Sequence, residues 1–370
     1  MKVMTVLGTR PEIIRLSRIM DRLDRHTSHV IVHTGQNADP RLKDVFYEEF
    51  QLRPPDHLLA MQGTVGEQWA TLFADGERLL RDERPDRLLI LGDTNSGMIA
   101  LLARRLGIPV IHLEAGNRCF NDRVPEEVNR RLIDHASEIL LPYTEGSRRN
   151  LLAEGIPGRR IFVVGNPIGE VLAHYEPQIT ASAILTTLKL QPQQYFLVTL
   201  HRAENVDSPQ RLQRLLAALV QVQERFRQPV IVSTHPRTRD RLDQRGIDSS
   251  SLPLQFHPPF GFFDFVHLER SARCVLTDSG TVQEECVLAG VPCVTLRHET
   301  ERPETLECGG NTIAGTEPTA IVQAVNRSLE GNGLMRIPPE YQIPHVSQTV
   351  LQIALGDVHG MSSSFFEQVL

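Results

Sequence analysis

The sequence lacks the features that mark several classes of protein. Its five cysteines are odd in number and include no C-x-x-C pair, so a disulfide framework or a structural zinc site is not expected. No apolar run reaches the roughly 20 residues of a membrane span, and the start lacks the apolar core of a signal peptide. A net charge of −6 argues against a nucleic-acid binder, which needs a basic face. We therefore expect a soluble, cytoplasmic protein with no nucleic-acid or membrane partner.

Two further absences concern cofactors. The His and Asp residues are scattered without H-x-x-x-H or C-x-x-C spacing, which gives little support for a metal site. No G-x-G-x-x-G follows the first predicted strand, and this disfavours a tightly held dinucleotide. We expect no metal and no cofactor.

The 370 residues are too many for one ordinary core, so two domains are expected. Short apolar runs alternate with amphipathic stretches, and this β-α-β order implies an α/β protein with parallel, doubly wound sheets. The predicted strands are Val3–Leu7, Val30–His33, Leu88–Leu91, Val110–Leu113, Ile139–Pro142, Ile161–Val164, Tyr195–Leu200, Val230–Ser233, Cys274–Thr277 and Cys293–Leu296. The predicted helices include one that starts near Pro11, and also Gln210–Phe226, Pro318–Leu329 and Val346–Leu355.

The stretch Pro167–Gln194 has no strong strand pattern, so we expect an interdomain hinge there. The predicted division is an N-terminal Rossmann-like domain over residues 1–170, a hinge over 171–194, a C-terminal Rossmann-like domain over 195–345, and a C-terminal helix and tail over 346–370. Two doubly wound domains that face a central cleft would bind ligands at the carboxyl ends of their strands.

The most informative segment runs from Val275 to Glu285. A buried apolar strand leads directly into the turn at Ser279 and Gly280, and a helix opens behind it. This arrangement directs free backbone N–H groups and the positive end of a helix dipole at one point, which makes an anion site. A Glu one turn later can accept hydrogen bonds from ribose hydroxyls. The segment therefore favours a nucleotide-diphosphate ligand.

Two carboxylates end neighbouring apolar strands. Asp93 follows Leu88–Leu91, and Glu114 follows Val110–Leu113. Asp93 could simply cap a helix, a common role for Asp. Glu114 is harder to explain structurally, because a Glu at the end of a buried strand needs a partner. Two carboxylates on one sheet edge fit acid–base chemistry.

Several other residues, most of them basic, are candidates for the site. For each of them a purely structural role is the alternative to a functional one. Arg10 is placed to neutralise a diphosphate, but it could be an ordinary surface arginine. His201 could satisfy a core hydrogen bond or contact an anion. Glu126 and Arg130 are four residues apart and could form only a helix-surface ion pair of roughly 0.3–0.5 kcal/mol. The ring of Phe265 lies in an aromatic-rich stretch, which is usually core but could stack on a base.

Taken together, these motifs resemble the non-hydrolysing UDP-N-acetylglucosamine 2-epimerase family from Met1 to roughly Leu355. The matching segments are Gly8-Thr9-Arg10-Pro11-Glu12, Gly92-Asp93-Thr94, Glu114-Ala115-Gly116, Pro125-Glu126-Glu127-Val128-Asn129-Arg130, His201-Arg202, Thr277-Asp278-Ser279-Gly280, Gln283-Glu284-Glu285 and Thr300-Glu301-Arg302-Pro303-Glu304. Other segments, among them Ser233-Thr234-His235-Pro236-Arg237, look closer to a branch that forms UDP-N-acetyl-L-fucosamine.

The resemblance implies a GT-B-like fold of two Rossmann-type domains, a homodimer, and no metal or redox cofactor. The implied reaction inverts C2 of a UDP-2-acetamido sugar. UDP leaves C1 as the C2 proton is removed, and it adds back to the bound 2-acetamidoglucal after reprotonation on the opposite face. Three other functions are alternatives: a GT-B glycosyltransferase, a hydrolysing relative that releases UDP, and a non-catalytic UDP-sugar sensor.

The resemblance also implies roles for particular residues. The acid–base carboxylates are Asp93, Glu114 and Glu126. The groups that stabilise the departing diphosphate are Arg10, Arg130 and His201. The other expected substrate-binding residues are Arg15, His235, Phe265 (stacked on uracil), Ser279, Gly280, Thr281, Glu285 and Arg302. The chain departs from the family pattern at Arg15, where many members have Lys, and at Thr281, where they have a second Gly.

Glu114→Gln should leave UDP binding nearly intact and reduce turnover by about 10²- to 10⁴-fold, the usual contribution of a general acid or base. Steady-state kinetics and UDP titration on the purified variant measure both quantities. Turnover that survives the substitution would remove Glu114 from proton transfer.

Overall fold

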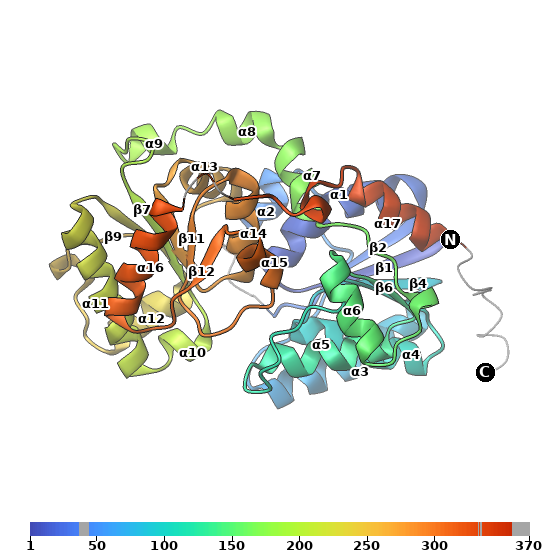
Figure 1. Cartoon of the computed structure of the whole chain (residues 1–370). Coiled ribbons are helices and arrows are strands. Elements are labelled where there is room, and N and C mark those ends of the chain that lie inside the picture. The colour runs from blue at the N-terminus through green and yellow to red at the C-terminus, as the bar shows by residue number, and fades with distance from the viewer. Residues whose placement is uncertain (37–43, 332, 334, 357–370) are drawn as a thin grey trace. The chain divides into compact units, whose positions relative to one another are not determined.

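The computed structural model describes residues 1–36, 44–331, 333 and 335–356 (Figure 1). The chain forms two compact units: unit 1 comprises Met1–Ala173 and Pro339–Leu370, and unit 2 comprises His174–Pro338. The C-terminal segment therefore belongs to unit 1. The functional division at residues 170, 194 and 345 stays a prediction.

Unit 1 contains a six-stranded sheet in which every strand pair is parallel. The strand order is β3-β2-β1-β4-β5-β6, the order of a doubly wound nucleotide-binding fold. The strands are β1 (Lys2–Leu7), β2 (Ser28–His33), β3 (His57–Leu58), β4 (Arg87–Leu91), β5 (Val110–Leu113) and β6 (Ile139–Leu141). The chain reverses its direction of winding between β1 and β4, so this point is the topological switch of the sheet.

Helices cover this sheet on both sides (Figure 1). Met4 and Val6 of β1 and Ile90 of β4 pack against Leu80 and Ile99 from the helices on one side. Two helices on the other side, α1 and α17, contact each other. The helices of unit 1 are α1 (Arg10–His26), α2 (Asp44–Glu49), α3 (Val65–Glu83), η2 (Asn95–Met98), α4 (Ile99–Arg105), α5 (Pro125–Ala136), α6 (Glu145–Ala153), η3 (Gly158–Arg160), α7 (Pro167–His174), η5 (Pro339–Gln342) and α17 (Val346–Leu355).

Unit 2 repeats the same topology. Its six strands are all parallel and lie in the order β12-β11-β10-β7-β8-β9, with the switch between β7 and β10. The strands are β7 (Phe196–Leu200), β8 (Val230–Thr234), β9 (Gln255–His257), β10 (Cys274–Thr277), β11 (Cys293–Thr295) and β12 (Asn311–Ile313). The helices are α8 (Glu176–Thr180), α9 (Ile184–Thr187), α10 (Ala203–Val206), α11 (Pro209–Phe226), α12 (Pro236–Gln244), η4 (Ser249–Ser251), α13 (Phe262–Ser271), α14 (Gly280–Ala289), α15 (Pro303–Glu307) and α16 (Pro318–Glu330).

The alternation of side chains along β7 produces two cores in unit 2. Val198 packs with Leu219 of α11 and Ile321 of α16 on one face. Leu197 packs with Leu268 of α13 on the other face. Successive strand residues point to opposite faces, so a fully apolar strand is needed where both faces are covered.

These findings confirm an α/β fold with two doubly wound Rossmann-type units, and correct parts of the strand prediction. Ile161–Val164 is not a strand, since only Ile161 forms an isolated bridge, to Leu140. The edge strands β3, β9 and β12 were not predicted. They are two or three residues long and partly exposed or polar, so they carry little apolar pattern.

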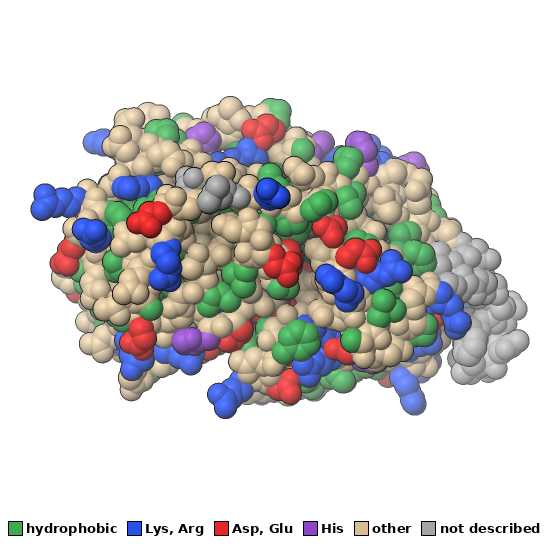
Figure 2. Space-filling view, viewed as in Figure 1, with side chains coloured by type: hydrophobic (Ala, Val, Ile, Leu, Met, Phe, Trp, Pro, Cys, Tyr) green, Lys and Arg blue, Asp and Glu red, His purple; other side chains and the backbone are tan. Residues whose placement is uncertain are grey.

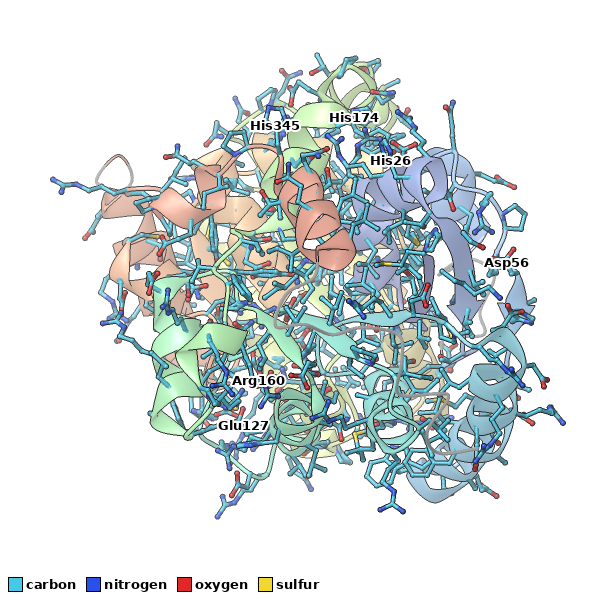
Figure 3. All side chains as sticks on the ribbon, turned by 90° about the vertical axis from the view of Figure 1, so that its right-hand side faces the viewer. His26, Asp56, Glu127, Arg160, His174 and His345 are labelled. Atoms are coloured by element: carbon cyan, nitrogen blue, oxygen red, sulfur yellow. The ribbon has the colours of Figure 1, made fainter. Side chains whose placement is uncertain are left out.

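Helix α17 lies beside α1 (Figures 1 and 3). Polar contacts as well as packing attach the two helices to each other. Arg22 Nε donates to Ser347 Oγ at 2.6 Å, and Arg22 Nη1 donates to Gln348 Oε1 at 2.7 Å. Ser347 Oγ in turn donates to Glu170 of α7 at 2.6 Å. The C-terminal helix is therefore joined to two helices that precede it by more than a hundred residues.

The visible face of the molecule carries acidic and basic side chains that are interspersed (Figure 2). No single-sign stripe appears among the described residues of that face. This distribution agrees with the modest net charge of −6.

Arg22→Ala should lower the free energy of unfolding by about 1–2 kcal/mol, because it removes two hydrogen bonds between a cation and α17. Arg25→Ala on the same helix is the control. Its side chain is 67% exposed, and we expect a change within about 0.5 kcal/mol. Urea denaturation measures both, and equal effects would contradict the role of Arg22.

Candidate functional site

The polar groups predicted from the sequence gather at the carboxyl ends of the strands in both units. In unit 1, β1 and β4 flank the topological switch, and the turns that follow them carry Arg10 and Asp93. In unit 2, β7 and β10 flank the switch, and the turns that follow carry His201 and Ser279. Open α/β sheets bind their ligands at these positions.

Glu12 joins the two turns of unit 1. Its Oε2 accepts from the backbone nitrogens of Gly8 at 2.9 Å and Thr9 at 2.7 Å, and its Oε1 accepts from Thr94 Oγ1 at 3.0 Å. Burial raises the pKa of Glu12 to about 7, although these hydrogen bonds act in the opposite direction. Glu12 was not among the predicted site residues, although the Thr-x-x-Glu pattern at the start of α1 is that of a capping box and indicates a structural role for this side chain.

Asp93 is held by a cation. Its Oδ2 accepts from Arg130 Nη2 at 2.5 Å and from Arg130 Nε at 3.0 Å. Arg130 Nη1 also donates to Glu127 (labelled in Figure 3) at 2.9 Å. The cap of η2 is Thr94, so Asp93 is not the N-cap that the sequence left as an alternative. The Asp93 side chain remains 19% exposed, which leaves it accessible to a ligand.

Glu114 has the charged partner that its position required. Arg15 Nη1 donates to Glu114 Oε2 at 2.5 Å, and both side chains are buried. The backbone of Glu114 has φ = 70°, a left-handed conformation that is uncommon for residues other than glycine. Such a backbone is kept only where the surroundings fix it, and it often marks a functional position.

A buried network supports the turns after β4 and β5. His112 Nε2 lies 2.8 Å from the carbonyl oxygen of Gly92, and His112 Nδ1 lies 2.8 Å from Asp134 Oδ1. Asp134 Oδ2 accepts from the backbone nitrogen of Gly116 at 3.2 Å and pairs with Arg118 at 2.7 Å. Burial acts to raise the pKa of Asp134, but His112 and Arg118 outweigh it and lower that pKa. This network could not be predicted from the sequence, because His112, Asp134 and Arg118 do not follow one another at the spacing of a known motif.

The remaining predicted residues of unit 1 are partly accessible. Glu126 lies in the first turn of α5 and is half-buried. Arg10 is also half-buried, and its guanidinium carbon lies 5.7 Å from the centre of the Phe46 ring. The edge of unit 1 thus combines half-buried charged groups with buried ones that hold them.

In unit 2, Asp278 organises the turn after β7. It accepts hydrogen bonds from the backbone nitrogens of His201 at 3.1 Å and Arg202 at 3.0 Å, and it lies 3.2 Å from His201 Nδ1. Burial acts to raise the pKa of Asp278, but the charge and hydrogen bonds of its neighbours, His201 first, lower it to about 2. His201 keeps a 30% exposed side chain. Asp278 belongs to the motif Thr277-Asp278-Ser279-Gly280, but the sequence did not indicate what its side chain does.

His235 extends this cluster. Its ring centre lies 5.6 Å from that of His201. His235 also caps α12, because its Nδ1 accepts from the backbone nitrogen of Arg237 at 3.2 Å. The structure therefore brings together two histidines that were predicted from separate strand ends.

The start of α14 has the geometry that the sequence predicted. The helix begins at Gly280 directly after β10, with Ser279 as its N-cap. Ser279 Oγ lies 3.0 Å from Thr281 Oγ1, so two hydroxyls stand at the first turn. Free N–H groups and hydroxyls at a helix N-terminus form a site for phosphate oxygens.

Arg302 lies beneath this turn. A β-carbon at Gly280 would approach the guanidinium carbon of Arg302 to 3.2 Å, and Arg302 Nε donates to Glu284 at 3.0 Å. Arg302 is only 4% exposed. Arg302 is thus a buried cation that supports the first turn of α14. The sequence pattern had predicted that Arg302 lies at the edge of the site.

Two other predicted binding residues are buried in unit 2. Phe265 is 7% exposed and packs in the apolar cluster with Leu268 and Val282. Glu285 is 6% exposed. Only small parts of these two side chains are accessible to a ligand.

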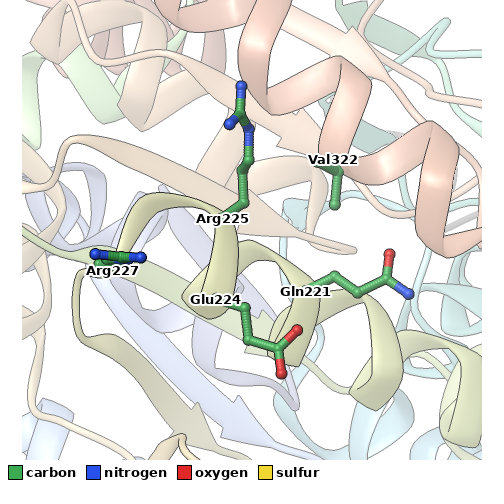
Figure 4. Close-up of a pocket in the computed structure, with 5 residues that line it drawn as sticks. All are labelled: Gln221, Glu224, Arg225, Arg227 and Val322. Carbon is green, nitrogen blue, oxygen red and sulfur yellow. The ribbon is translucent and has the colours of Figure 1, made fainter.

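A surface cavity of about 630 Å³ lies elsewhere in unit 2 (Figure 4). Its lining residues are Gln221, Glu224 and Arg225 of α11, Arg227 at the end of that helix, and Val322 of α16. These positions are on helices and not on the turns that follow the strands, so this cavity is separate from the groups described above.

No three His, Cys, Asp or Glu side chains gather as possible metal ligands within the described part of the chain. Within the same residues, no helix is long and apolar enough to cross a membrane.

The fold and the edge groups define a protein of the GT-B-like class, with two doubly wound units that carry polar groups at their switch points. Comparison with known proteins gives the family. The profile of the UDP-N-acetylglucosamine 2-epimerase family matches residues 21–355. The chain belongs to this family.

Several relatives are similar over most of their length. UDP-N-acetylglucosamine 2-epimerase of Methanocaldococcus jannaschii is 40% identical over 335 residues, which cover 88% of this chain and 91% of the relative. UDP-2,3-diacetamido-2,3-dideoxy-D-glucuronate 2-epimerase of Pseudomonas aeruginosa is 37% identical and covers 89% and 92%. A crystal structure of the M. jannaschii enzyme with UDP-GlcNAc and UDP has a TM-score of 0.90 at 37% identity, with 95% and 99% covered.

Asp278→Asn should lower the free energy of unfolding at pH 7 by roughly 2 kcal/mol, since the pKa drops from 3.8 to about 2 on folding. A lowered carboxyl pKa stabilises the protein above the unfolded value, so the difference should shrink as the pH falls from about 4 toward 2. Denaturant titrations at pH 7 and pH 3 measure it. The exposed Asp240→Asn is the control; an equal loss there would contradict the role of Asp278.

Proposed function

We propose that this protein inverts C2 of a UDP-2-acetamido-2-deoxy sugar and is a UDP-N-acetylhexosamine 2-epimerase of the non-hydrolysing type. The observation that carries the proposal is the grouping of charges at the two switch points. Unit 1 has carboxylates there, and unit 2 has a helix N-terminus with two histidines. Membership of the UDP-N-acetylglucosamine 2-epimerase family indicates which reaction these charged groups would catalyse.

The nucleotide is assigned to unit 2. The diphosphate is bound by the first turn of α14 through Ser279, Gly280 and Thr281. The free backbone N–H groups and the positive end of the helix dipole favour anions at the N-terminus of any helix. Glu285 accepts the ribose hydroxyls and Phe265 stacks on uracil.

The leaving diphosphate is stabilised by cations. As the bond to C1 breaks, UDP gains negative charge, so cations fixed in advance stabilise the transition state more than the bound substrate. Arg10, Arg130 and His201 have this role, with His235 and Arg15 as further binding residues. Asp278 supports it, because its carboxylate accepts hydrogen bonds from the backbone nitrogens of His201 and Arg202 and so fixes this turn.

Proton transfer at C2 is assigned to Asp93, Glu114 and Glu126. A planar glycal intermediate must lose a proton on one face and regain it on the other, which requires acids or bases from more than one element. Asp93 follows β4, Glu114 follows β5 and Glu126 begins α5. The ion pair between Asp93 and Arg130, at 2.5 Å, fixes the position of this carboxylate.

The sugar is proposed to be of the UDP-GlcNAc to UDP-ManNAc type. Relatives that act on UDP-GlcNAc and on a UDP-diacetamido-glucuronate are both similar to this chain. The alternative is the conversion of UDP-2-acetamido-2,6-dideoxy-L-talose to UDP-N-acetyl-L-fucosamine. Assays of both sugars in parallel distinguish them by kcat/KM.

We also propose a cytoplasmic homodimer. Val128 and Leu132 lie one turn apart on α5 and are 44% and 42% exposed, which supplies part of an apolar contact surface. Sedimentation equilibrium of the purified protein tests the stoichiometry.

The reaction is tested by incubating the enzyme with its UDP-sugar in deuterated water. Deuterium should appear at C2 of both epimers, because the proton is lost and regained from solvent, and mass spectrometry with NMR detects it. Glu114→Gln is the matched control. Its Arg15 partner loses a counter-ion, so thermal denaturation must first confirm folding.

Absence of deuterium at C2 while the sugar passes to an acceptor would favour a GT-B glycosyltransferase. Net accumulation of UDP would identify a hydrolysing enzyme. Tight binding without exchange would identify a UDP-sugar sensor.

A further inference from the structure

Glu269 is a buried acid that the proposed reaction does not use. It lies on α13 and is 1% exposed. Neither carboxyl oxygen accepts a hydrogen bond from a donor group among the described residues. An ionised carboxylate in such a place would be very costly.

The polar neighbours of Glu269 come from three other elements. Glu285 and Cys286 lie on α14, Cys293 lies on β11, and Tyr195 precedes β7. Burial first, and then the negative charge of Glu285, raise the pKa of Glu269 far above its usual range. When two carboxyls share one apolar site, one of them retains its proton.

The surroundings explain why the pair is held together. Helices α13 and α14 pack against each other, and the space between them and the sheet is filled by apolar side chains that include Leu268, Val282 and Cys286. Glu285 is itself 6% exposed. A side chain with three rotatable bonds at this position needs a fixed partner to keep one orientation.

We propose that Glu269 is a neutral positioning residue whose carboxyl O–H donates to the Glu285 carboxylate and fixes it for the two ribose hydroxyls of the nucleotide. This inference rests on the proposed function, since it concerns the ribose contact of the same site. No proton leaves the pair during turnover. Fixing the acceptor in advance removes the entropic cost of ordering it when the ligand binds.

Two variants separate the hydrogen bond from the packing. Glu269→Gln keeps a donor of the same length, and Glu269→Met keeps a similar volume without a donor. Calorimetric titration with UDP and with 2′-deoxy-UDP measures affinity and the preference for ribose. Melting temperatures establish folding, and the Met variant should stay folded because Met has a similar volume and is apolar, as its surroundings are.

The Gln variant should bind UDP within about 2-fold of the wild type. The Met variant should bind UDP about 5- to 20-fold more weakly, as expected for one lost hydrogen bond to a charged group. Its preference for UDP over 2′-deoxy-UDP should fall by a similar factor. The kcat at saturating substrate should change little, because the contact is remote from C2.

Unchanged affinity and unchanged ribose preference in the Met variant would overturn the proposal and leave Glu269 with a packing role. If the Met variant fails to fold, Glu269→Leu supplies a second donor-free variant for the same titrations. Failure of the proposed function looks different, because the wild type itself would then incorporate no deuterium at C2 of its UDP-sugar.

Discussion

Carboxylates paired with basic side chains at the carboxyl ends of the strands are the interaction on which the rest of this structure depends. Asp93 is bound to Arg130 and Glu114 to Arg15 in unit 1, and Asp278 binds His201 in unit 2. Glu114 and Asp278 are buried, and neither could be buried without a partner, because an unpaired charge in a protein interior is strongly unfavourable. Each pair therefore fixes the turn that carries it, and the functional groups keep their positions before any ligand binds.

This arrangement also accounts for the strained backbone of Glu114 at the same edge. Glu114 has a left-handed backbone that only a rigid environment maintains. The environment is the buried network of His112, Asp134 and Arg118, which ties the turns after β4 and β5 together. In unit 2, Arg302 and Glu284 support the first turn of α14 from below. The turns after β4 and β5 and the start of α14 are thus held by buried ionic groups.

Much of the fold could be predicted because it depends on local patterns. The central strands are continuous apolar runs, and α1 and α11 begin with proline and a capping residue, so their existence follows from the sequence. The edge strands β3, β9 and β12 could not be found this way, since their few residues are polar or exposed and are strands only because a neighbour pairs with them. The prediction of a strand at Ile161–Val164 was wrong for the opposite reason: the segment is apolar, but only Ile161 pairs with a strand, through an isolated bridge.

The sequence by itself determined the two doubly wound units, the turns that carry functional groups, and the family, because apolar periodicity and residue types at strand ends are local properties. The tertiary structure decided the pairing: Arg15 meets Glu114 across 99 residues, Arg302 is buried beneath Gly280, and Glu269 lies against Glu285. It also returned the C-terminal helix to unit 1. These facts depend on which surfaces meet when the sheets form, and contacts between distant segments leave no pattern in one chain.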